Sequence, residues 1–410
     1  MSDHLRIAIF HLGFFYSGGG EKLVLEEARH LAARGHSVRV FAPIVDPRVC
    51  FPDLIAQVGP RQLLPRLPNL FSVGDGLTLL AASLFAKLLV RDIDADVYLG
   101  ANQPGAWLAR QAARAHGRRY VVYLNQPNRL LEPRAIDRDP TSVVVRKDFF
   151  LLSGATLAGR PLLSVLDRLS VRDAAARLGD GPYMTSVLRS YYGGGWQNCP
   201  AATVPAASPP TDLADRPRAE LTINGARLRG PIVLLTNRHY PQKRFEWMFP
   251  VIRAVRDAFP AATLVITGQE TVYTDQLRTT LVRDGLQQLV RFLGLVTEAD
   301  LLRLYRAATA YVYPSPDEDF GLGLVEAMGQ GTPVVAWNNA GPSGIIEDGI
   351  SGRLVPLNDH AGFAAAVTAL VADEALRMRL GLGAWKRATE HFSFRAHTDI
   401  LERALREAAG

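Results

Sequence analysis

The stretch SPDEDFGLGLVEAMGQGTPVVAW, residues 315–337, combines an acidic loop, a glycine-rich turn and an apolar run. Glu318 lies in the loop, and Glu326 lies about one turn inside a helix that we predict to begin near Leu322. The glycines between them expose backbone amides at the start of that helix. Because carboxylates accept hydrogen bonds from vicinal hydroxyls, this spacing suits a polyol with two contact regions, such as a sugar and a ribose. The alternative is an acidic loop followed by a carboxylate that the helix dipole favours.

Strands and helices alternate on both sides of this stretch. In the C-terminal half, apolar or β-branched runs predict strands at PIVLLTN (231–237), ATLVITG (262–268), LVRFLG (289–294), ATAYVYPS (308–315), TPVVAWN (332–338) and GRLVPL (352–357), with a helix at TEADLLRLYRAA (297–308). The N-terminal half predicts strands at RIAIFHL (6–12), SVRVFAP (37–43), DVYLGAN (96–102), YVVYLNQ (120–126) and PAATVPA (200–206), and a helix that ends at Gly35. This alternation predicts an α/β protein of right-handed βαβ units, with parallel sheets covered on both faces.

The chain has 410 residues, which is long for a single hydrophobic core, so we expect two domains. We place one Rossmann-like domain at 1–205, a linker rich in Pro, Ser and Asp at 206–229, and a second Rossmann-like domain at 230–392. A C-terminal helix at 393–410 is expected to pack back on the first domain. Ligands of such sheets bind at the carboxyl ends of the strands, so the loops that follow the strands are where we look for chemistry.

Two further loops carry residues suited to phosphate binding. GFFYSGGGEK places Gly18 and Gly19 between a strand and a helix, where backbone amides can approach a phosphate, although a tight turn is the alternative. TNRHYPQKR places Arg238 after a strand and Lys243 at a plausible helix start. A planar guanidinium and a compact ammonium can together bind a diphosphate. Two solvated surface cations are the alternative.

The composition narrows the class of function. The formal net charge is +6, without basic runs interleaved with aromatic residues, so we expect no nucleic-acid partner. An anionic substrate or an anionic membrane surface suits this charge, as does a solvated surface without a partner. Cys50 and Cys199 cannot form a disulfide framework and no signal peptide is recognisable, so we expect a cytoplasmic protein. The apolar run at 70–90 contains Asp75 and Lys87 and predicts a surface-packed helix, not a membrane span.

The order of the glycine loop, the Arg/Lys pair and the two glutamates resembles the large family 4 of retaining glycosyltransferases. Members of this family have the GT-B fold, in which two Rossmann-like domains with parallel sheets face each other across a cleft. The resemblance runs through nearly the whole chain and is densest over 231–357. It implies that Arg238 and Lys243 hold the diphosphate of a nucleotide-sugar donor, with Gly18 and Gly19 close to it.

The same resemblance assigns the two glutamates. It implies that Glu318 contacts the donor sugar and that Glu326 contacts the ribose hydroxyls, while backbone near Leu293 to Val296 contacts the base in part. The implied donor site also contains three residues of the glycine-rich turn: Phe320, Gly321 and Leu322.

A narrower resemblance concerns the sugar and the acceptor. DPRVCFPDL (46–54) and GGGEKLVLE (18–26) are similar to segments of mannosyltransferases that extend lipid-linked oligosaccharides, which implies transfer of mannose from GDP-mannose to a glycan or polyprenyl-linked glycan. YLNQPNRLLEPR stands where relatives have an acceptor-facing segment, so Asn125, Gln126 and Arg129 are acceptor-side candidates. Asn125 replaces a common histidine and Gly344 replaces a common glutamate, so no histidine-assisted role is carried over.

The implied reaction moves a hexose with retained anomeric configuration. Arg238, Lys243 and Glu318 are its catalytic candidates, and the leaving phosphate takes the proton of the acceptor. No metal is expected, although two acidic clusters are of the kind that binds Mg²⁺: Asp92, Asp94 and Asp96 in one, and Asp317, Glu318 and Asp319 in the other.

Alternatives to a soluble transferase also follow from the sequence. Residues 148–173 mix apolar residues with arginines, which suits either a lipid-facing surface at the cytoplasmic side of a membrane or core packing. A nucleotide-sugar epimerase or hydrolase on the same fold would need a base beside the glutamates, and no histidine stands next to them in the sequence. A sugar-nucleotide-binding protein without catalysis is the remaining alternative.

Overall fold

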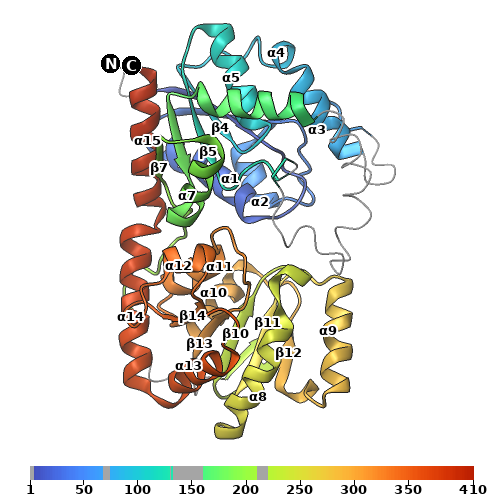
Figure 1. The fold of residues 1–410 in the computed structure, drawn as a ribbon, viewed down its shortest axis with the longest axis vertical. Coiled ribbons are helices and arrows are strands. Elements are labelled where there is room, and N and C mark those ends of the chain that lie inside the picture. The colour runs from blue at the N-terminus through green and yellow to red at the C-terminus, as the bar shows by residue number, and fades with distance from the viewer. Residues whose placement is uncertain (1–3, 68–73, 130, 133–159, 210–219) are drawn as a thin grey trace. The chain divides into compact units, whose positions relative to one another are not determined.

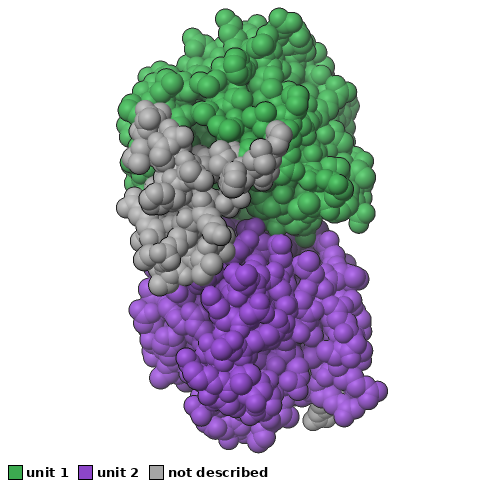
Figure 2. All heavy atoms as spheres, turned by 90° about the vertical axis from the view of Figure 1, so that its right-hand side faces the viewer, with its two compact units in different colours: residues 1–138, 144–201, 394–410 green, residues 139–143, 202–393 purple. Residues whose placement is uncertain are grey.

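The computed structural model describes residues 4–67, 74–129, 131–132, 160–209 and 220–410 (Figure 1). The chain forms two compact units, coloured separately in Figure 2. Unit 1 comprises residues 1–138, 144–201 and 394–410, and unit 2 comprises residues 139–143 and 202–393. The chain therefore leaves unit 1 after Ala201 and returns to it at Phe394.

Unit 1 is built on a parallel sheet. In its described part, seven strands follow the order β3-β2-β1-β4-β5-β6-β7, and every neighbouring pair is parallel. The order changes direction between β1 and β4, which is where ligands bind in doubly wound sheets. The strands are β1 (Arg6–His11), β2 (Ser37–Ala42), β3 (Arg61–Gln62), β4 (Val97–Ala101), β5 (Tyr120–Leu124), β6 (Ala176–Gly179) and β7 (Trp196–Asn198).

Helices cover this sheet, and the last one comes from the C-terminus of the chain. Helix α15 packs against α1 and against β4, β5 and β6 of unit 1 (Figure 1). Helix α1 ends at Ala33, just before Gly35 with its left-handed φ of 92°, as the sequence predicted. The helices are α1 (Gly19–Ala33), α2 (Pro52–Val58), α3 (Gly74–Leu84), α4 (Ala86–Leu89), α5 (Gly105–His116), α7 (Gly181–Tyr192) and α15 (Phe394–Ala409), and residues 160–172 are also helical.

Unit 2 repeats the design with a second parallel sheet. Its described strands follow the order β12-β11-β10-β13-β14-β15, so the direction of winding changes between β10 and β13. The strands are β10 (Ile232–Thr236), β11 (Thr263–Thr267), β12 (Val290–Phe292), β13 (Ala310–Tyr313), β14 (Val334–Trp337) and β15 (Arg353–Val355). The helices are α8 (Met248–Ala258), α9 (Val272–Arg283), α10 (Glu298–Ala307), α11 (Leu322–Gly329), α12 (Ala340–Ile345), α13 (His360–Ala372) and α14 (Glu374–His391).

The core of unit 2 explains why its strands read as continuous apolar runs. All four residues of β13 and of β14 are buried, as expected for parallel strands covered on both faces. Trp337 at the end of β14 is fully buried and packs on Phe363 of α13, with 4.7 Å between the ring centroids. These runs therefore identified the strands of this sheet correctly.

Two parts of the strand prediction were wrong. PAATVPA is not a strand: within it, Thr203 makes one isolated bridge with Ser393, because the prolines at positions 200 and 205 lack the N–H that a ladder needs. The strands β6 (ARLG) and β7 (WQN) were not predicted, because four and three residues are too few to show a strand pattern.

The segment predicted as a linker contains a hairpin of β8 (Leu221–Ile223) and β9 (Ala226–Leu228). Asn224 and Gly225 form its turn with φ of 47° and 76°, the conformation that Asn-Gly hairpin turns adopt. The apolar run at 70–90 forms α3 and α4 in its described part. Across the described residues, no helix has both the length and the apolar composition that a membrane crossing requires.

Candidate active site

The loops that follow β10 and β13 carry the residues that the sequence singled out. These two strands are neighbours in the sheet, and the order of strands changes direction between them. Arg238 and Lys243 follow β10, with Lys243 at the end of a 3-10 helix, and Glu318 follows β13. Because carboxyl ends of adjacent parallel strands meet at one edge, the cations and the carboxylate are brought to the same place.

Lys243 and Glu318 are in direct contact. The Nζ of Lys243 donates to Oε2 of Glu318, and the hydroxyl of Tyr313 donates to the same oxygen over 2.8 Å. The side chains of Lys243 and Glu318 are 20% and 15% exposed, so the pair is partly shielded from water yet still open to a ligand. An ammonium and a carboxylate at this edge can serve a diphosphate and a hydroxyl group, respectively.

Arg238 reaches this place through its neighbour. Its backbone N–H donates to Oδ1 of Asn237 over 3.0 Å, and Nδ2 of Asn237 donates to the hydroxyl of Tyr313 over 3.3 Å. The guanidinium of Arg238 stacks over the ring of Tyr240, 5.3 Å from its centroid. Arg238 is thus joined to Glu318 by hydrogen bonds through Asn237 and Tyr313, whereas its guanidinium lies over an aromatic face.

Glu326 is held by a different tyrosine. Helix α11 begins at Leu322, as predicted, and Glu326 lies on it. The hydroxyl of Tyr305, in α10, donates to Oε2 of Glu326 over 2.9 Å. The same hydroxyl lies 3.1 Å from Oγ1 of Thr236, the last residue of β10.

Glycine is required at positions 321 and 323, between the two glutamates, for two different structural reasons. Gly321 is the N-cap of α11 with φ of 115°, a conformation that residues with a Cβ rarely adopt. At Gly323, a Cβ would lie 2.4 Å from the hydroxyl oxygen of Tyr311, so the side chain of Tyr311 occupies the room that a larger residue would need. The loop before them is fastened by Gly341, whose N–H donates to the carbonyl of Glu318 over 2.8 Å.

The remaining donor-site candidates of unit 2 divide into packed and accessible residues. Phe320 is buried and packs edge-on against Phe392, and Leu322 is half-buried at the helix start. Leu293 follows β12 and is buried, and its carbonyl accepts from Nδ2 of Asn224 in the hairpin over 2.9 Å. Val296 is half-buried. The described polar contact of Leu293 is thus made by its backbone carbonyl, while its side chain is buried.

His239 stands in the loop between Arg238 and Tyr240 but is fully buried. Its Nδ1 lies 2.9 Å from Oγ1 of Thr274, and burial lowers the pKa of its imidazole to about 4. A neutral imidazole without exposed surface cannot take a proton from a substrate. The loop therefore supplies cations, not a histidine base.

In unit 1, the acceptor-side candidates form two hydrogen-bonded groups. Asn125, just after β5, donates from Nδ2 to Asp180 over 3.0 Å and accepts from Nδ2 of Asn102 over 2.8 Å. Arg129 donates to Oε1 of Gln126 over 3.4 Å. Asn102 and Asp180 were missed by the sequence analysis, although each directly follows a strand.

The glycine loop of unit 1 lies at the carboxyl edge of the unit 1 sheet, as Asn125 does. Gly18 is the N-cap of α1 and Gly19 is its first residue. At Gly18, a Cβ would lie 2.3 Å from Oε2 of Glu21 and 2.7 Å from a ring carbon of Tyr16, so this position has no room for a side chain. A side chain at position 18 would therefore have to displace Glu21 and Tyr16 at the start of α1.

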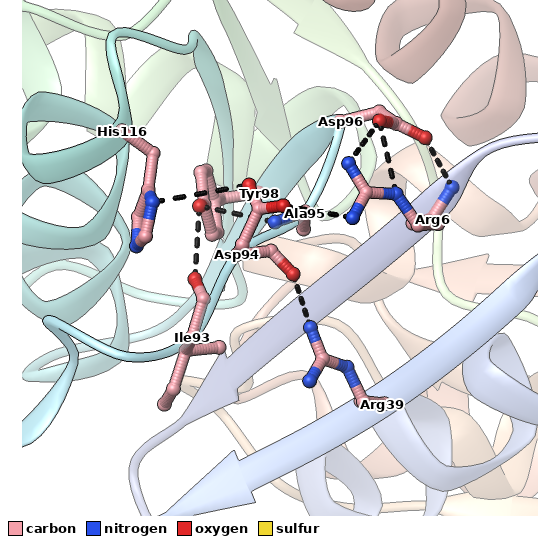
Figure 3. Close-up of polar contacts among 8 residues, drawn as sticks. All are labelled: Arg6, Arg39, Ile93, Asp94, Ala95, Asp96, Tyr98 and His116. Atoms are coloured by element: carbon pink, nitrogen blue, oxygen red, sulfur yellow. Dashed lines mark hydrogen bonds and ion pairs between the residues drawn. The ribbon is translucent and has the colours of Figure 1, made fainter.

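The acidic residues Asp94 and Asp96, which precede β4, form ion pairs with Arg6 (Figure 3). Arg6 contacts Asp94 at 2.8 Å and Asp96 at 2.7 Å, and the hydrogen bonds from Arg6 hold the pKa of both carboxyls below the usual value. Since Arg6 begins β1, this cluster lies at the amino edge of the sheet, opposite the edge that carries Asn125. In the part of the chain that the structure describes, no three His, Cys, Asp or Glu side chains are grouped to hold a metal ion.

The segment expected to face a membrane is described in part. Residues 148–159 lie outside the described residues, and residues 160–172 form a helix with Leu162 and Val165 exposed. A second apolar surface, which was not predicted from the sequence, lies where α3 ends and α4 begins. Leu84, Phe85 and Leu88 are 58%, 57% and 58% exposed.

Comparisons with known proteins identify the families that this chain resembles. The family model described as "Glycosyltransferase Family 4" matches residues 17–154, and "Glycosyl transferases group 1" matches residues 230–373. The phosphatidyl-myo-inositol mannosyltransferase of Mycobacterium leprae (strain TN) is 28% identical over 378 residues, covering 89% of this chain and 87% of that protein. The D-inositol 3-phosphate glycosyltransferase of Corynebacterium kroppenstedtii is 34% identical over 235 residues, covering 51% of this chain and 48% of that protein.

Solved structures show the fold. The crystal structure of Anabaena Alr3699/HepE in complex with UDP and glucose superposes with a TM-score of 0.71 at 18% sequence identity, covering 98% of this chain and 100% of that one. This likeness confirms the predicted GT-B fold.

Proposed function

The chain belongs to family 4 of the glycosyltransferases, and from this premise we propose that it moves a hexose from a nucleoside diphosphate sugar to an acceptor hydroxyl with retained anomeric configuration. The observation that carries the proposal is the contact of Lys243 with Glu318 at the carboxyl ends of β10 and β13. It joins the residue suited to the diphosphate with the residue suited to the sugar.

Lys243 and Arg238 act on the leaving group in this proposal. The bond between the anomeric carbon and the diphosphate oxygen breaks, and negative charge grows on that oxygen. Preorganised cations stabilise the charge most where it is largest, in the transition state. No metal cofactor is invoked, because these two side chains supply the positive charge. Activity is accordingly expected to survive EDTA.

Glu318 orients the sugar and does not attack it. Its Oε2 already accepts hydrogen bonds from Lys243 and Tyr313, which stabilises the carboxylate and makes it a poor nucleophile. The acceptor oxygen bonds to the anomeric carbon on the face that the diphosphate leaves, and the acceptor proton passes to the released phosphate oxygen. A glycosyl adduct on Glu318, detected by mass spectrometry, would overturn this assignment.

The proposed donor is GDP-mannose and the proposed acceptor is a glycan or polyprenyl-linked glycan. Support comes from the narrower sequence resemblance and from the mannosyltransferase similar to this chain. The names of the similar proteins also place inositol phosphates and phosphatidyl-inositol in the acceptor panel to be tested.

We also propose that unit 1 docks on the cytoplasmic face of an anionic membrane. The exposed residues Leu84, Phe85 and Leu88 lie beside the exposed cations Lys87 and Arg91. A cavity of about 390 Å³ at the amino end of β5 is lined by Arg114, Arg118 and Arg119, and by Arg110, whose charge Asp173 in the same lining offsets. Apolar side chains flanked by cations are typical of helices that lie in the headgroup region of anionic bilayers.

The decisive experiment compares donor turnover in the chain and in Lys243→Ala. Loss of one such charged donor lowers the rate about a hundredfold, while the exposed control Lys386→Ala keeps full activity. GDP-mannose, UDP-glucose and UDP-GlcNAc are supplied with and without each acceptor. Turnover that needs no acceptor would indicate a hydrolase or epimerase, and binding without turnover would indicate a non-catalytic protein.

A further inference from the structure

Two tyrosines of unit 2 each contact one of the two glutamates. Tyr313 donates to Oε2 of Glu318 over 2.8 Å, and Tyr305 donates to Oε2 of Glu326 over 2.9 Å. The two tyrosines are 4% and 1% exposed, so their hydroxyls are buried beneath the carboxylates. Neither tyrosine was recognised from the sequence as part of a site.

The contact to Glu318 is one end of a chain of hydrogen bonds. The hydroxyl of Tyr313 accepts from Nδ2 of Asn237 over 3.3 Å while it donates to Glu318. Oδ1 of Asn237 accepts from the backbone N–H of Arg238 over 3.0 Å. Both ends of the Asn237 amide are therefore used, which fixes the direction in which the Tyr313 proton points, namely toward Glu318.

The contact to Glu326 ends a second chain. The hydroxyl of Tyr305 lies 3.1 Å from Oγ1 of Thr236, which in turn lies 2.9 Å from the hydroxyl of Tyr311. Tyr311 also donates to the carbonyl of Thr236 over 3.2 Å. The Thr236 hydroxyl has one proton, which it can donate to Tyr305 or to Tyr311, and Tyr305 donates to Glu326.

The two series of hydrogen bonds start from consecutive residues at the end of β10. Thr236 leads to Glu326 and Asn237 leads to Glu318. Burial raises the pKa of Tyr305 and of Tyr313 well above the usual value, and the neighbouring glutamates raise it further. Both hydroxyls therefore stay protonated and remain donors throughout the physiological pH range.

We propose that Tyr313 and Tyr305 are positioning residues that orient the two glutamates independently, Tyr313 for recognition of the donor sugar and Tyr305 for recognition of the ribose. This inference rests on the proposed function, because it assigns the two carboxylates to the two parts of a nucleotide sugar. Its new content is that the two parts are controlled by separate hydrogen-bond chains and can be weakened separately.

The test measures binding of GDP and of GDP-mannose, and of UDP and UDP-glucose, by titration calorimetry. Tyr313→Phe is expected to weaken binding of the nucleotide sugar about tenfold or more while binding of the nucleoside diphosphate stays unchanged, since a hydrogen bond to a charged group is lost. Tyr305→Phe is expected to weaken both ligands by the same factor.

A matched control exists in the same unit. Tyr273 is also buried, and its hydroxyl donates to Glu246, so Tyr273→Phe removes the same kind of bond from a different place. It is expected to leave all four affinities unchanged. In addition, Tyr313→Phe combined with Glu318→Gln is expected to bind no worse than Glu318→Gln alone, because the tyrosine acts through Glu318.

The outcomes separate the inference from the proposed function. If the unaltered chain binds none of the four nucleotides, the proposed function fails. If it binds them but Tyr313→Phe weakens the nucleoside diphosphate as much as the nucleotide sugar, or neither variant weakens any ligand, the inference fails while the function stands. A lower kcat at unchanged nucleoside diphosphate affinity in Tyr313→Phe supports positioning, which a general loss of stability would not produce.

Discussion

Replacing Gly323 by alanine tests the packing that places Glu326. The new Cβ would lie 2.4 Å from the hydroxyl oxygen of Tyr311, 3.3 Å from Oγ1 of Thr236 and 3.4 Å from Cζ of Tyr311. Tyr311 is fully buried, and its ring lies against those of Tyr305 and Tyr313 with centroid distances of 5.6 and 6.3 Å. It cannot move aside without disturbing both of the tyrosines that hold glutamates.

The expected cost follows from two opposing effects. Overpacking a filled site destabilises by about 1–3 kcal/mol. Alanine in place of glycine in a helix stabilises by about 0.5–1 kcal/mol. Because the contact at 2.4 Å is far inside normal separation and involves a buried ring, we expect the clash to win and Gly323→Ala to destabilise α11 by about 1 kcal/mol.

Hydrogen exchange of the α11 and β13 amides measures this locally, which suits a chain of two units whose global unfolding need not be two-state. The matched control is Gly20→Ala, also at the second position of its helix, where the nearest atoms would lie at 3.6 and 3.8 Å. Removing the hydroxyl in Gly323→Ala/Tyr311→Phe is expected to restore protection in part. Undiminished protection in Gly323→Ala, or a double variant no better than the single one, would refute the reasoning.

Three further predictions concern unit 1. The buried imidazole of His397 contacts Glu27 at 2.9 Å, and although burial opposes its charge, the contacts with Cys199 and Glu27 hold its pKa well above the usual value. Such a group adds stability that is present below about pH 6.5 and is lost as pH rises through the folded-state pKa. Hydrogen-exchange protection of α15 should therefore fall toward alkaline pH. The variant His397→Leu should abolish this pH dependence and lower the free energy of unfolding by about 3–5 kcal/mol. Replacing Leu84, Phe85 and Leu88 together by serine should lower co-sedimentation with phosphatidylglycerol vesicles several-fold. The control Val272→Ser/Val282→Ser on α9 should not lower it, and equal loss in both variants would contradict the proposed membrane-docking surface. Asn125→Ala should raise KM for the acceptor while KM for the donor stays unchanged. Steady-state kinetics with each substrate varied in turn measures both constants, and a raised KM for the donor would contradict the assignment of Asn125 to the acceptor side.

The sheets could be predicted from the sequence where burial on both faces leaves a continuous apolar run. The runs in β10, β11, β13 and β14 are of this kind, and each was placed within a residue or two of its observed ends. β6 and β7 could not be found this way, because they are four and three residues long, and β7 also carries two exposed polar side chains. PAATVPA shows the opposite error: its apolar residues suggested a strand that its prolines do not permit.

In the candidate site, too, some residues could be predicted from the sequence and others could not. Lys243 and Glu318 could be paired from the sequence because each follows a strand, and the topology makes those strands neighbours. Tyr313, which contacts Glu318, was not recognised because an aromatic residue inside an apolar run is typical of a core. Tyr305, which contacts Glu326, lies on α10 and not in such a run. Yet Tyr311 and Tyr313 lie two residues apart and therefore on the same face of β13, whose last residue is Tyr313. A hydroxyl there must find a partner when buried, and in a parallel sheet the nearest polar groups are those of the ligand-binding loops. Paired tyrosines at the carboxyl end of a buried parallel strand are therefore a physical signal for a site, and the glycine at position 323 is its counterpart on the facing helix.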